Sequence, residues 1–408
     1  MHFKIRQGLD LKIEGTPRQA IENGPEIPAV ALCGADFPGV RPKFRVEPGQ
    51  VVSQGEALFV DRHRPDIAFV APVAGMVERI DRSTRGHFDY VVIRREGDAV
   101  RSVDISGDVR EVLLASGLWP SLTARPFGGI PDPDATAEAI LVTAMDSNPL
   151  AADPAVVVSE AQQEFQKGLQ VLAELTSGQV FVCQAAGDAL FPAEEEHIHC
   201  VRFSGPHPAG LPGTHLDRLG LTGRSAWQIG YQAVISIGRL FLNGRMSSER
   251  VVAVAGPAAA RPRLIRTVPG ASLAALAAGE MQEGRTRIVS GSILSGRVSL
   301  FLGFHHTQIC LLPEPSESSG FLRRLWGSSD VTRPLLPTEA FEAALPLNIL
   351  PVPLMRALSV GDDEAAENLG ATELLEEDVA LLSYLCPSGS DYGMLLRQSL
   401  DRIAGGAS

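Results

Sequence analysis

Residues 46–80, VEPGQVVSQGEALFVDRHRPDIAFVAPVAGMVERI, constrain the fold more than any other segment. Short apolar runs are separated by turns at Gly49 and Gly55, a polar tip follows at 61–66, and a further strand follows the motif APVAG. Alternating runs bounded by Gly and Pro are typical of short strands joined by tight turns. The segment therefore predicts a small β unit built around a hairpin.

This arrangement is similar to that of biotinyl and lipoyl carrier domains, which attach their cofactor to a lysine at the hairpin tip. Here the tip is Arg62-His63-Arg64, and no lysine occurs between Lys43 and Lys167. We therefore expect a carrier-like barrel-sandwich fold that carries neither biotin nor lipoate.

Length and charge limit the classes of protein to consider. A chain of 408 residues is too long for one ordinary core, so several domains are expected. The net charge of −12 argues against nucleic acid or an anionic membrane surface as the main partner. The start MHFKIRQGLDLKIEG lacks a secretory apolar region, and no apolar stretch approaches the roughly 20 residues of a membrane helix. We expect a cytoplasmic chain that does not span the membrane.

The cysteines are spread widely and form no CxxC motif. This pattern predicts free buried thiols and neither a disulfide framework nor a cluster or zinc site. They are Cys33, Cys183, Cys200, Cys310 and Cys386.

The pattern changes after about residue 100. AILVTAM (139–145) is a continuous apolar run typical of a buried parallel strand, and QVFVCQA (179–185) and HIHCVRF (197–203) read as further strands. A helix is expected between the first two strands, and another at 231–242, before Asn243-Gly244. The face of the first helix comprises Val158, Ala161, Phe165, Leu169 and Leu172, and we expect this helix to end near Gly178. Strand, helix and strand in this order predict an α/β layer with right-handed crossovers.

The remaining chain predicts two further units. Residues 261–279 read as a strand, a turn at Pro269-Gly270 and a short helix from Ser272, which suits a β-grasp module. The last sixty residues show helical periodicity. We therefore predict an α/β multidomain protein with a barrel-sandwich domain at 1–100, a Rossmann-like α/β domain at 101–255, a β-grasp (SLBB-like) module at 256–312, a linker at 313–346 and a helical domain at 347–408.

Histidines offer one possible metal site. HIHC places His197 and His199 two residues apart on one strand face, and His207 or His215 could complete a ligand set. The flanking acidic residues favour a solvated turn instead. His305-His306 lie in a strand-like run, where neighbouring rings point to opposite faces and serve packing. We expect no metal and no catalytic residue.

The strand at 139–145 has a candidate site at each end. The preceding RPFGGIPDP (125–133) retains only Gly128 and Gly129 where an α/β domain would present a flavin or nucleotide loop. Beyond the strand, Asp146 and Asn148 fall at the carboxyl edge of the sheet, where ligand crevices occur. Turn formation and helix capping explain these two residues equally well.

Nine motifs occur in one order along the chain. They are GLDLKIEGTP (8–17), VALCGADFPGVRP (30–42), APVAG (71–75), TAMDSNPLAADP (143–154), SGPHPAGLPGTH (204–215), IGYQAVISIGRLF (229–241), RLIRTVPGASL (263–273), RIVSGSILSG (287–296) and EEDVALLSYLCPSGSDYG (376–393). This series strongly resembles the NqrA family, which supplies one subunit of the Na⁺-translocating NADH:quinone reductase, and the resemblance runs collinearly from about residue 8 to 402.

The resemblance implies a non-redox subunit that is peripheral on the inner, cytoplasmic face of the bacterial membrane and is an enzyme only as part of its complex. The complex uses NADH, flavins, iron–sulfur centres and ubiquinone, and this chain is expected to bind no cofactor itself. Cys386 stands alone where cluster-bearing relatives have cysteine quartets. The implied partners are the other subunits, chiefly a membrane subunit, and no nucleic acid.

The resemblance also suggests contact with quinone. Phe127 offers apolar surface beside the shortened loop, and the Asn148 amide can donate to a quinone carbonyl. An ionised Asp146 cannot donate and would orient its neighbour. We predict weak quinone contact at this edge.

The segment 313–346 is shorter than in typical members of the family. Two other interpretations therefore stay open. One is a scaffold or ligand-binding paralogue that has left the complex, and the other is a stand-alone flavin- or NADH-binding oxidoreductase.

Overall fold

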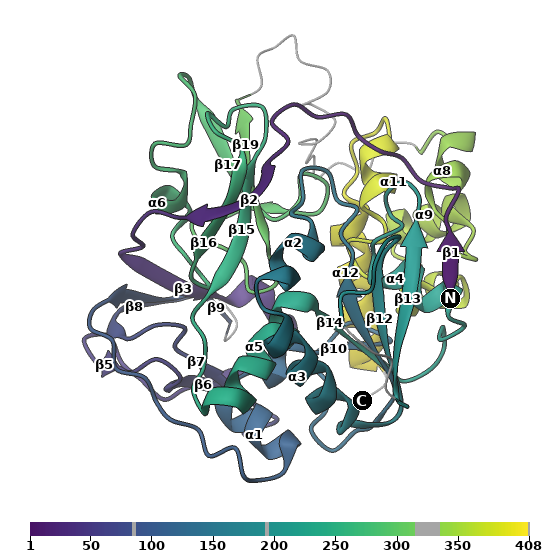
Figure 1. Ribbon diagram of the computed structural model, residues 1–408. Helices are drawn as coiled ribbons and strands as arrows, with labels where there is room; N and C mark the ends of the chain where they lie inside the picture. The colour runs from purple at the N-terminus through teal and green to yellow at the C-terminus, as the bar shows by residue number, and fades with distance from the viewer. Residues whose placement is uncertain (84–86, 192–195, 315–334, 407–408) are drawn as a thin grey trace.

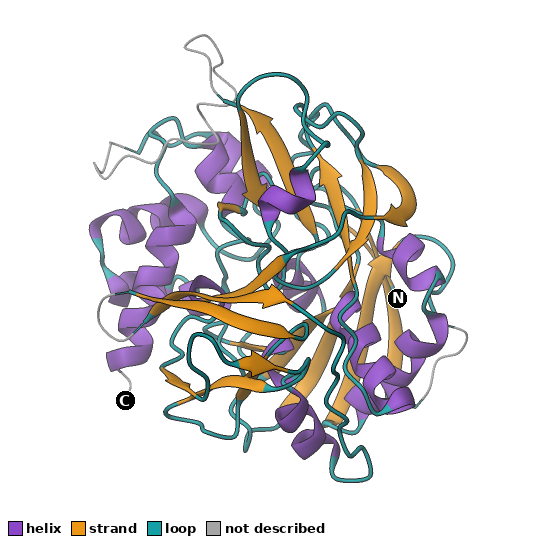
Figure 2. Ribbon diagram, turned by 90° about the vertical axis from the view of Figure 1, so that its left-hand side faces the viewer, coloured by secondary structure: helices purple, strands orange, loops and turns teal. Residues whose placement is uncertain are grey.

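The computed structural model describes residues 1–83, 87–191, 196–314 and 335–406. Its strands form four sheets, and a group of helices near the C-terminus lies beside them (Figures 1 and 2).

The largest α/β layer is a six-stranded sheet with the order β1-β13-β12-β11-β14-β10. The strands are β1 (His2–Lys4), β10 (Thr123–Arg125), β11 (Ala137–Ala144), β12 (Thr176–Ala185), β13 (Ile198–Ser204) and β14 (Ala226–Gly230). All neighbours are parallel except β10, which is antiparallel to β14. The three apolar runs predicted as strands are therefore confirmed as β11, β12 and β13.

Helices cover both faces of this sheet, which explains its continuous apolar strands. Ile140 and Val142 of β11 share a buried cluster with α3 (Gln162–Ala173) and α5 (Tyr231–Asn243). Leu141 points to the other face and packs in a cluster with Leu216 of α4 (Pro212–Arg218). The helix expected at 231–242 is confirmed as α5, which ends at Gly244 in the left-handed conformation.

The first predicted helix is in fact two, and it ends earlier than expected. Asp153 caps α2 (Pro154–Ser159), and α3 starts after Ala161, whose φ of −143° is not helical. The apolar pattern continues across this break and so hid it. Gly178 lies inside β12, where a Cβ would be 1.8 Å from the Glu138 carbonyl oxygen. This glycine permits close strand pairing and does not end a helix.

The second six-stranded sheet has the order β18-β17-β19-β15-β16-β2. Its strands are β2 (Arg18–Asn23), β15 (Arg250–Ala255), β16 (Arg263–Thr267), β17 (Thr286–Ser290), β18 (Arg297–Val298) and β19 (Gln308–Pro313). The predicted strand, turn and helix are confirmed as β16, Gly270 with φ of 69°, and α6 (Leu273–Ala277), which begins after Ser272.

The carrier-like unit consists of two small sheets, β3-β9-β8-β5 and β4-β6-β7. Their strands are β3 (Ala29–Cys33), β4 (Pro42–Phe44), β5 (Val51–Val52), β6 (Ala57–Asp61), β7 (Ala68–Val70), β8 (Gly75–Arg82) and β9 (Phe88–Arg95). The predicted hairpin is β6 and β7, with Arg62-His63-Arg64 in the turn between them. α1 (Val109–Ser116) follows this unit and ends at Gly117.

The N-terminal residues pair outside the carrier-like unit. β1 is parallel to β13 in the first large sheet, and β2 is parallel to β16 in the second. Neither pairing could be read from the segment 1–25, because the partner strands lie far away in the sequence.

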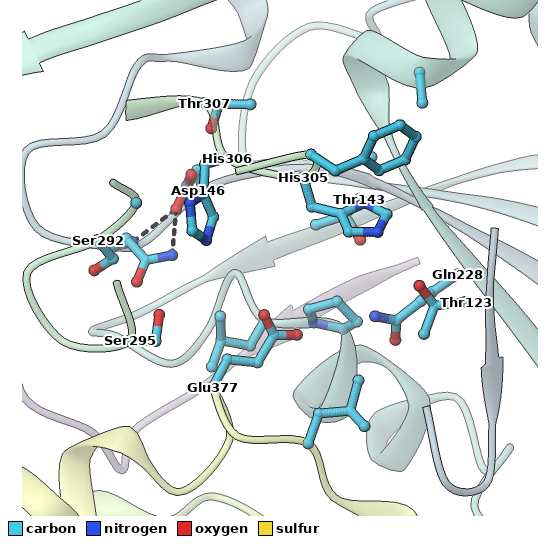
Figure 3. Close-up of a pocket in the computed structure, with 18 of the residues that line it drawn as sticks. Thr123, Thr143, Asp146, Gln228, Ser292, Ser295, His305, His306, Thr307 and Glu377 are labelled. Atoms are coloured by element: carbon cyan, nitrogen blue, oxygen red, sulfur yellow. Dashed lines mark hydrogen bonds between the residues drawn. The ribbon is translucent and has the colours of Figure 1, made fainter. Parts of the chain in front are cut away.

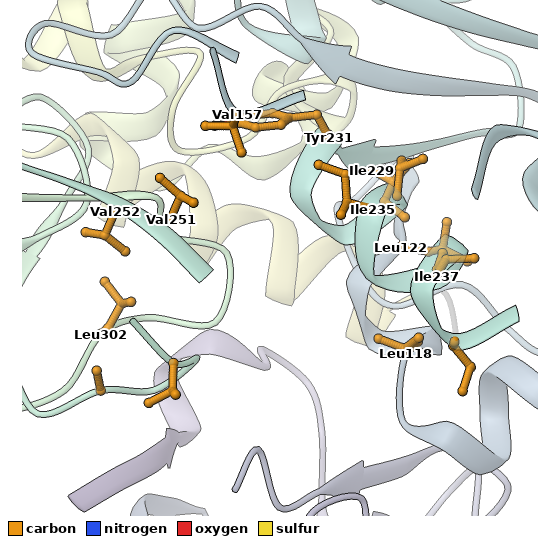
Figure 4. Close-up of a cluster of buried hydrophobic side chains, with 14 of the residues drawn as sticks. Leu118, Leu122, Val157, Ile229, Tyr231, Ile235, Ile237, Val251, Val252 and Leu302 are labelled. Atoms are coloured by element: carbon orange, nitrogen blue, oxygen red, sulfur yellow. The ribbon is translucent and has the colours of Figure 1, made fainter. Parts of the chain in front are cut away.

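One apolar cluster joins all four sheets. Val30, Phe59, Ile140 and Val252 each come from a different sheet and belong to it. Figure 4 shows its centre, where α5 meets side chains of β15 and of the segment after α1. The units share this core.

The C-terminal helices have a core of their own. They are α8 (Glu339–Ala344), α9 (Pro351–Val360), α10 (Asp363–Asn368), α11 (Ala380–Leu385) and α12 (Tyr392–Gly406). Phe341, Leu354 and Leu396 are fully buried in it. The helical periodicity of the last sixty residues is confirmed by these helices. The expected linker at 313–346 lies partly outside the described residues, and its last part forms α8.

Candidate functional site at the carboxyl edge of the parallel sheet

The parallel sheet changes direction of winding at β11. The chain passes from β11 to β12 and β13 on one side, and then returns to place β14 on the other side of β11. The helices that follow β11 and β14 consequently leave toward opposite sides. Open α/β sheets bind ligands at such a point, beyond the carboxyl ends of the strands.

A cavity of about 390 Å³ lies at this point. The end of β11, the start of α5 and the loops before β18 and β19 line it, together with the C-terminal segment 375–377. In Figure 3, Thr143, His305 and Gln228 lie toward one side, Asp146, His306 and Ser292 toward the other, and Glu377 enters from the C-terminal segment.

Asp146 and Asn148 both line this cavity, at the carboxyl edge of the sheet as their positions after β11 predicted. The backbone N and the Nδ2 of Asn148 donate to Asp146 Oδ1 over 2.8 and 2.9 Å. Burial raises the pKa of the Asp146 carboxyl to about 6, against the opposing effect of these hydrogen bonds. The turn-forming role and the cavity-lining role of Asp146 are therefore compatible.

Phe127 lies elsewhere. Its φ is 72°, its N donates to the Thr372 carbonyl over 2.9 Å, and its ring packs against the C-terminal helical cluster. Its own carbonyl accepts from Arg397 over 3.1 Å. The structure thus brings Asp146 and Asn148 together, while the neighbour of Phe127, Gly128, lines the cavity.

The shortened glycine loop faces protein. A Cβ on Gly128 would lie 2.1 Å from the Leu375 side chain. The C-terminal segment therefore occupies the space beside this loop.

Glu377 is a cavity residue that the sequence did not single out. Burial, and next the charge of Asp378, raise the pKa of the Glu377 carboxyl to about 7. Its Oε1 has no hydrogen bond and lies 3.9 Å from an amino nitrogen of the buried Arg125. The periodicity of EEDVALLSYL indicated only a helix, so no local signal pointed to this role.

His305 and His306 do not lie in a strand, contrary to the expectation. They occupy a turn before β19 and line the cavity. Burial lowers the pKa of His305 to about 4 and that of His306 to about 3, so both rings are neutral at pH 7. His306 Nδ1 is 2.7 Å from Ser290 Oγ, which holds the ring in place.

The four histidines considered for metal binding are not brought together. His199 contacts Gln179, His207 contacts Ser147 and His215 contacts the carbonyl of Ala209, while His197 is exposed. Within the described part of the chain, no three His, Cys, Asp or Glu side chains are arranged to hold a metal ion.

All cysteines are free and buried, as predicted. Burial raises the pKa of the Cys33 thiol to about 12 and that of Cys310 to about 11, so both are thiols at pH 7.

The chain is similar to known proteins over nearly its whole length. Residues 3–96 match the NqrA N-terminal barrel-sandwich hybrid domain, 105–246 the NqrA second alpha/beta domain, and 251–299 the NQRA C-terminal domain. These matches confirm the predicted α/β multidomain fold class. Across the described residues, the helices are all too short or too polar to cross a membrane.

Two relatives bear the name of this subunit of the Na(+)-translocating NADH-quinone reductase. The one from Pseudomonas aeruginosa is 42% identical and that from Saccharophagus degradans 42%, each over 98% of this chain and 99% of the relative. The first alignment spans 443 positions, so it includes positions that this 408-residue chain lacks. A solved NAD+-reducing NiFe hydrogenase, at 12% identity and a TM-score of 0.38 over 65% of this chain and 55% of its own, is too distant to bear on function.

Proposed function

Because this chain belongs to the NqrA family of Na(+)-translocating NADH-quinone reductase subunits, we propose that it serves such a complex as a non-redox subunit. In this role it lies at the cytoplasmic face of the membrane, contacts the other subunits, chiefly a membrane subunit, and contributes to catalysis only within the assembly. The observation that carries this proposal is the identity of 42% over nearly the full length of both chains.

Three features support a role without a resident cofactor. The hairpin tip carries arginine and histidine where a carrier would need lysine. The cysteines are buried thiols. The loop at Gly128 packs against Leu375, which leaves it no room to enclose a flavin phosphate. The last feature also argues against a stand-alone flavin oxidoreductase.

We further propose that a quinone headgroup contacts the cavity beside Asp146 and Asn148. A quinone carbonyl needs a hydrogen-bond donor, and the Asn148 amide has a second N–H besides the one given to Asp146. Below about pH 6 the Asp146 carboxyl is protonated as well and can donate. Met145, Leu211 and Ile229 supply apolar surface in the same lining.

Titration of the purified protein with a soluble short-chain quinone tests this site, by calorimetry or ligand-observed NMR. Replacement of Asn148 by alanine is expected to weaken binding about fivefold, the usual effect of one lost hydrogen bond. The matched control is Asn243→Ala at the exposed end of α5, which should leave the affinity unchanged. Phe127→Leu should also have no effect, because Phe127 packs in the C-terminal cluster.

Undetectable binding at millimolar quinone, or equal binding by wild type and Asn148→Ala, would remove quinone contact at this edge. The role within the complex is tested separately. The tagged chain, expressed with the membrane subunits, should co-purify with them from detergent-solubilised membranes.

A further inference from the structure

Arg250 is a charged side chain for which the fold provides no acid. It begins β15, is partly buried and lines the cavity at the sheet edge. Among the described residues, no carboxylate lies within ion-pair distance of its guanidinium and none accepts a hydrogen bond from it. Burial lowers its pKa, and the only charged group found to oppose this is Tyr231. A buried cation without a partner is costly, so this position favours an anionic ligand.

The fold holds Arg250 next to the positive end of a long helix. Gln232, in the first turn of α5, donates to the Val251 carbonyl over 2.8 Å and accepts from the Val251 N–H over 2.9 Å. The N-cap of α5, Gly230, has no side chain to accept from the free N–H groups of the first turn. A Cβ at Gly230 would meet nothing within 4 Å, so the space there is open. The helix dipole and Arg250 thus act on the same anion.

The nearest acid shared with the cavity wall does not compete for Arg250. Asp36 lines the cavity, but one oxygen is paired with Arg297 and the other accepts from the Phe304 N–H over 3.0 Å. Its charge is already compensated.

Arg250 also lines a second cavity, of about 60 Å³, whose walls are mostly apolar. Leu118, Phe69 and Leu302 are among its lining residues, and it shares Ala233 as well as Arg250 with the polar cavity. The two cavities therefore adjoin, with the guanidinium at their boundary. At 10–15 Å³ per water-sized group, the apolar cavity has room for roughly four or five methylene groups.

We propose that the two cavities together bind a carboxylate with an alkyl chain of about six to eight carbons, the class of a medium-chain fatty acid. The carboxylate lies against Arg250 and the first turn of α5, and the chain enters the apolar cavity. Arginine binds carboxylates through paired charge-assisted hydrogen bonds. This inference does not depend on the quinone proposal, which rests on Asn148 and a neutral ring.

The test compares octanoate, octanol and acetate by calorimetry on the intact chain at pH 7.5. Octanoate should bind at least about tenfold more tightly than octanol, which lacks the charge, and about tenfold more tightly than acetate, which lacks the chain. Arg250→Gln should weaken octanoate by about tenfold and leave octanol unchanged. Arg245→Gln, which removes an exposed arginine, is the matched control and should change nothing.

The comparison of the three ligands on the wild type needs no variant and so does not depend on how Arg250→Gln folds. Equal binding of octanoate and octanol would overturn the assignment of Arg250. Equal binding of octanoate and acetate would overturn the assignment of the apolar cavity. No binding of octanoate at millimolar concentration would overturn both.

Discussion

Glu377 and Arg125 show how single side chains connect the α/β layer to the C-terminal helices. Arg125 is 2% exposed, and its Nε donates to Gln228 Oε1 over 2.9 Å while Nη1 contacts Asp378 Oδ2 over 3.1 Å. Asp378 also accepts from the Leu375 N–H over 2.8 Å. Glu377 stands next to this pair but is not satisfied by it. The site wall therefore contains a carboxyl whose ionisation the fold opposes.

We predict that Glu377→Gln makes the protein more stable above neutral pH. A carboxyl whose folded pKa is raised to about 7, from an ordinary 4.5, lowers the free energy of unfolding as the pH rises between these values. The glutamine variant lacks this effect, so it should match the wild type at pH 4 and exceed it at pH 8. Thermal unfolding at a series of pH values measures the difference. A constant difference between variant and wild type across pH 4–8 would contradict the prediction.

At the scale of elements, the crossing of α3 and α5 depends on one glycine from each helix. A Cβ on Gly168 would lie 2.1 Å from the Val234 carbonyl oxygen, and one on Gly238 would lie 1.7 Å from the Glu164 carbonyl oxygen. Both contacts are with backbone, which cannot move aside as a side chain can. The close crossing places the start of α5 at the cavity, because the rest of α5 is fixed against α3.

We predict that Gly238→Ala lowers the free energy of unfolding by about 1–3 kcal/mol, the usual cost of overpacking, although alanine is the better helix former. The control is Gly405→Ala in α12, where a Cβ meets nothing within 4 Å. That variant should be neutral or slightly more stable. Urea unfolding of the two variants and the wild type gives the comparison, and a Gly238→Ala protein as stable as wild type would show that the helices can separate without cost.

At the scale of the whole molecule, the carrier-like unit is attached to its neighbours. Arg64 at the hairpin tip pairs with Asp132 over 2.7 Å and with Asp134 over 2.8 Å. These exposed pairs contribute little stability, but they show that the tip faces the α/β layer. The same unit shares a core with the other sheets. A carrier hairpin must reach its partner enzymes, whereas this one is engaged within the chain.

We predict that the purified protein is colourless and has the mass of the unmodified chain. The hairpin tip offers no lysine for biotin or lipoate, and the buried thiols are not arranged to hold a cluster. An absorbance spectrum from 300 to 600 nm and an intact-mass measurement check this. Flavin absorbance in stoichiometric amount, or a lipoyl mass increase, would show that the chain carries a cofactor after all.

The sequence by itself determined the elements whose signals are local. The apolar run at β11, the helical face and glycine stop of α5, and the turn at Gly270 each depend on neighbouring residues, and each was predicted. The position of Asp146 and Asn148 at the sheet edge followed from β11 in the same way. Local patterns failed where the chain breaks without losing its apolar period, as between α2 and α3.

Only the tertiary structure decided which distant segments meet. Arg250, His305 and Glu377 line one cavity although they come from three separate parts of the chain, and no local pattern marks them. The left-handed backbone of Phe127 turned this residue into the C-terminal cluster. Strand and helix signals follow from interactions between near neighbours, whereas a cavity depends on how whole elements pack, and packing is set by the total burial of apolar surface.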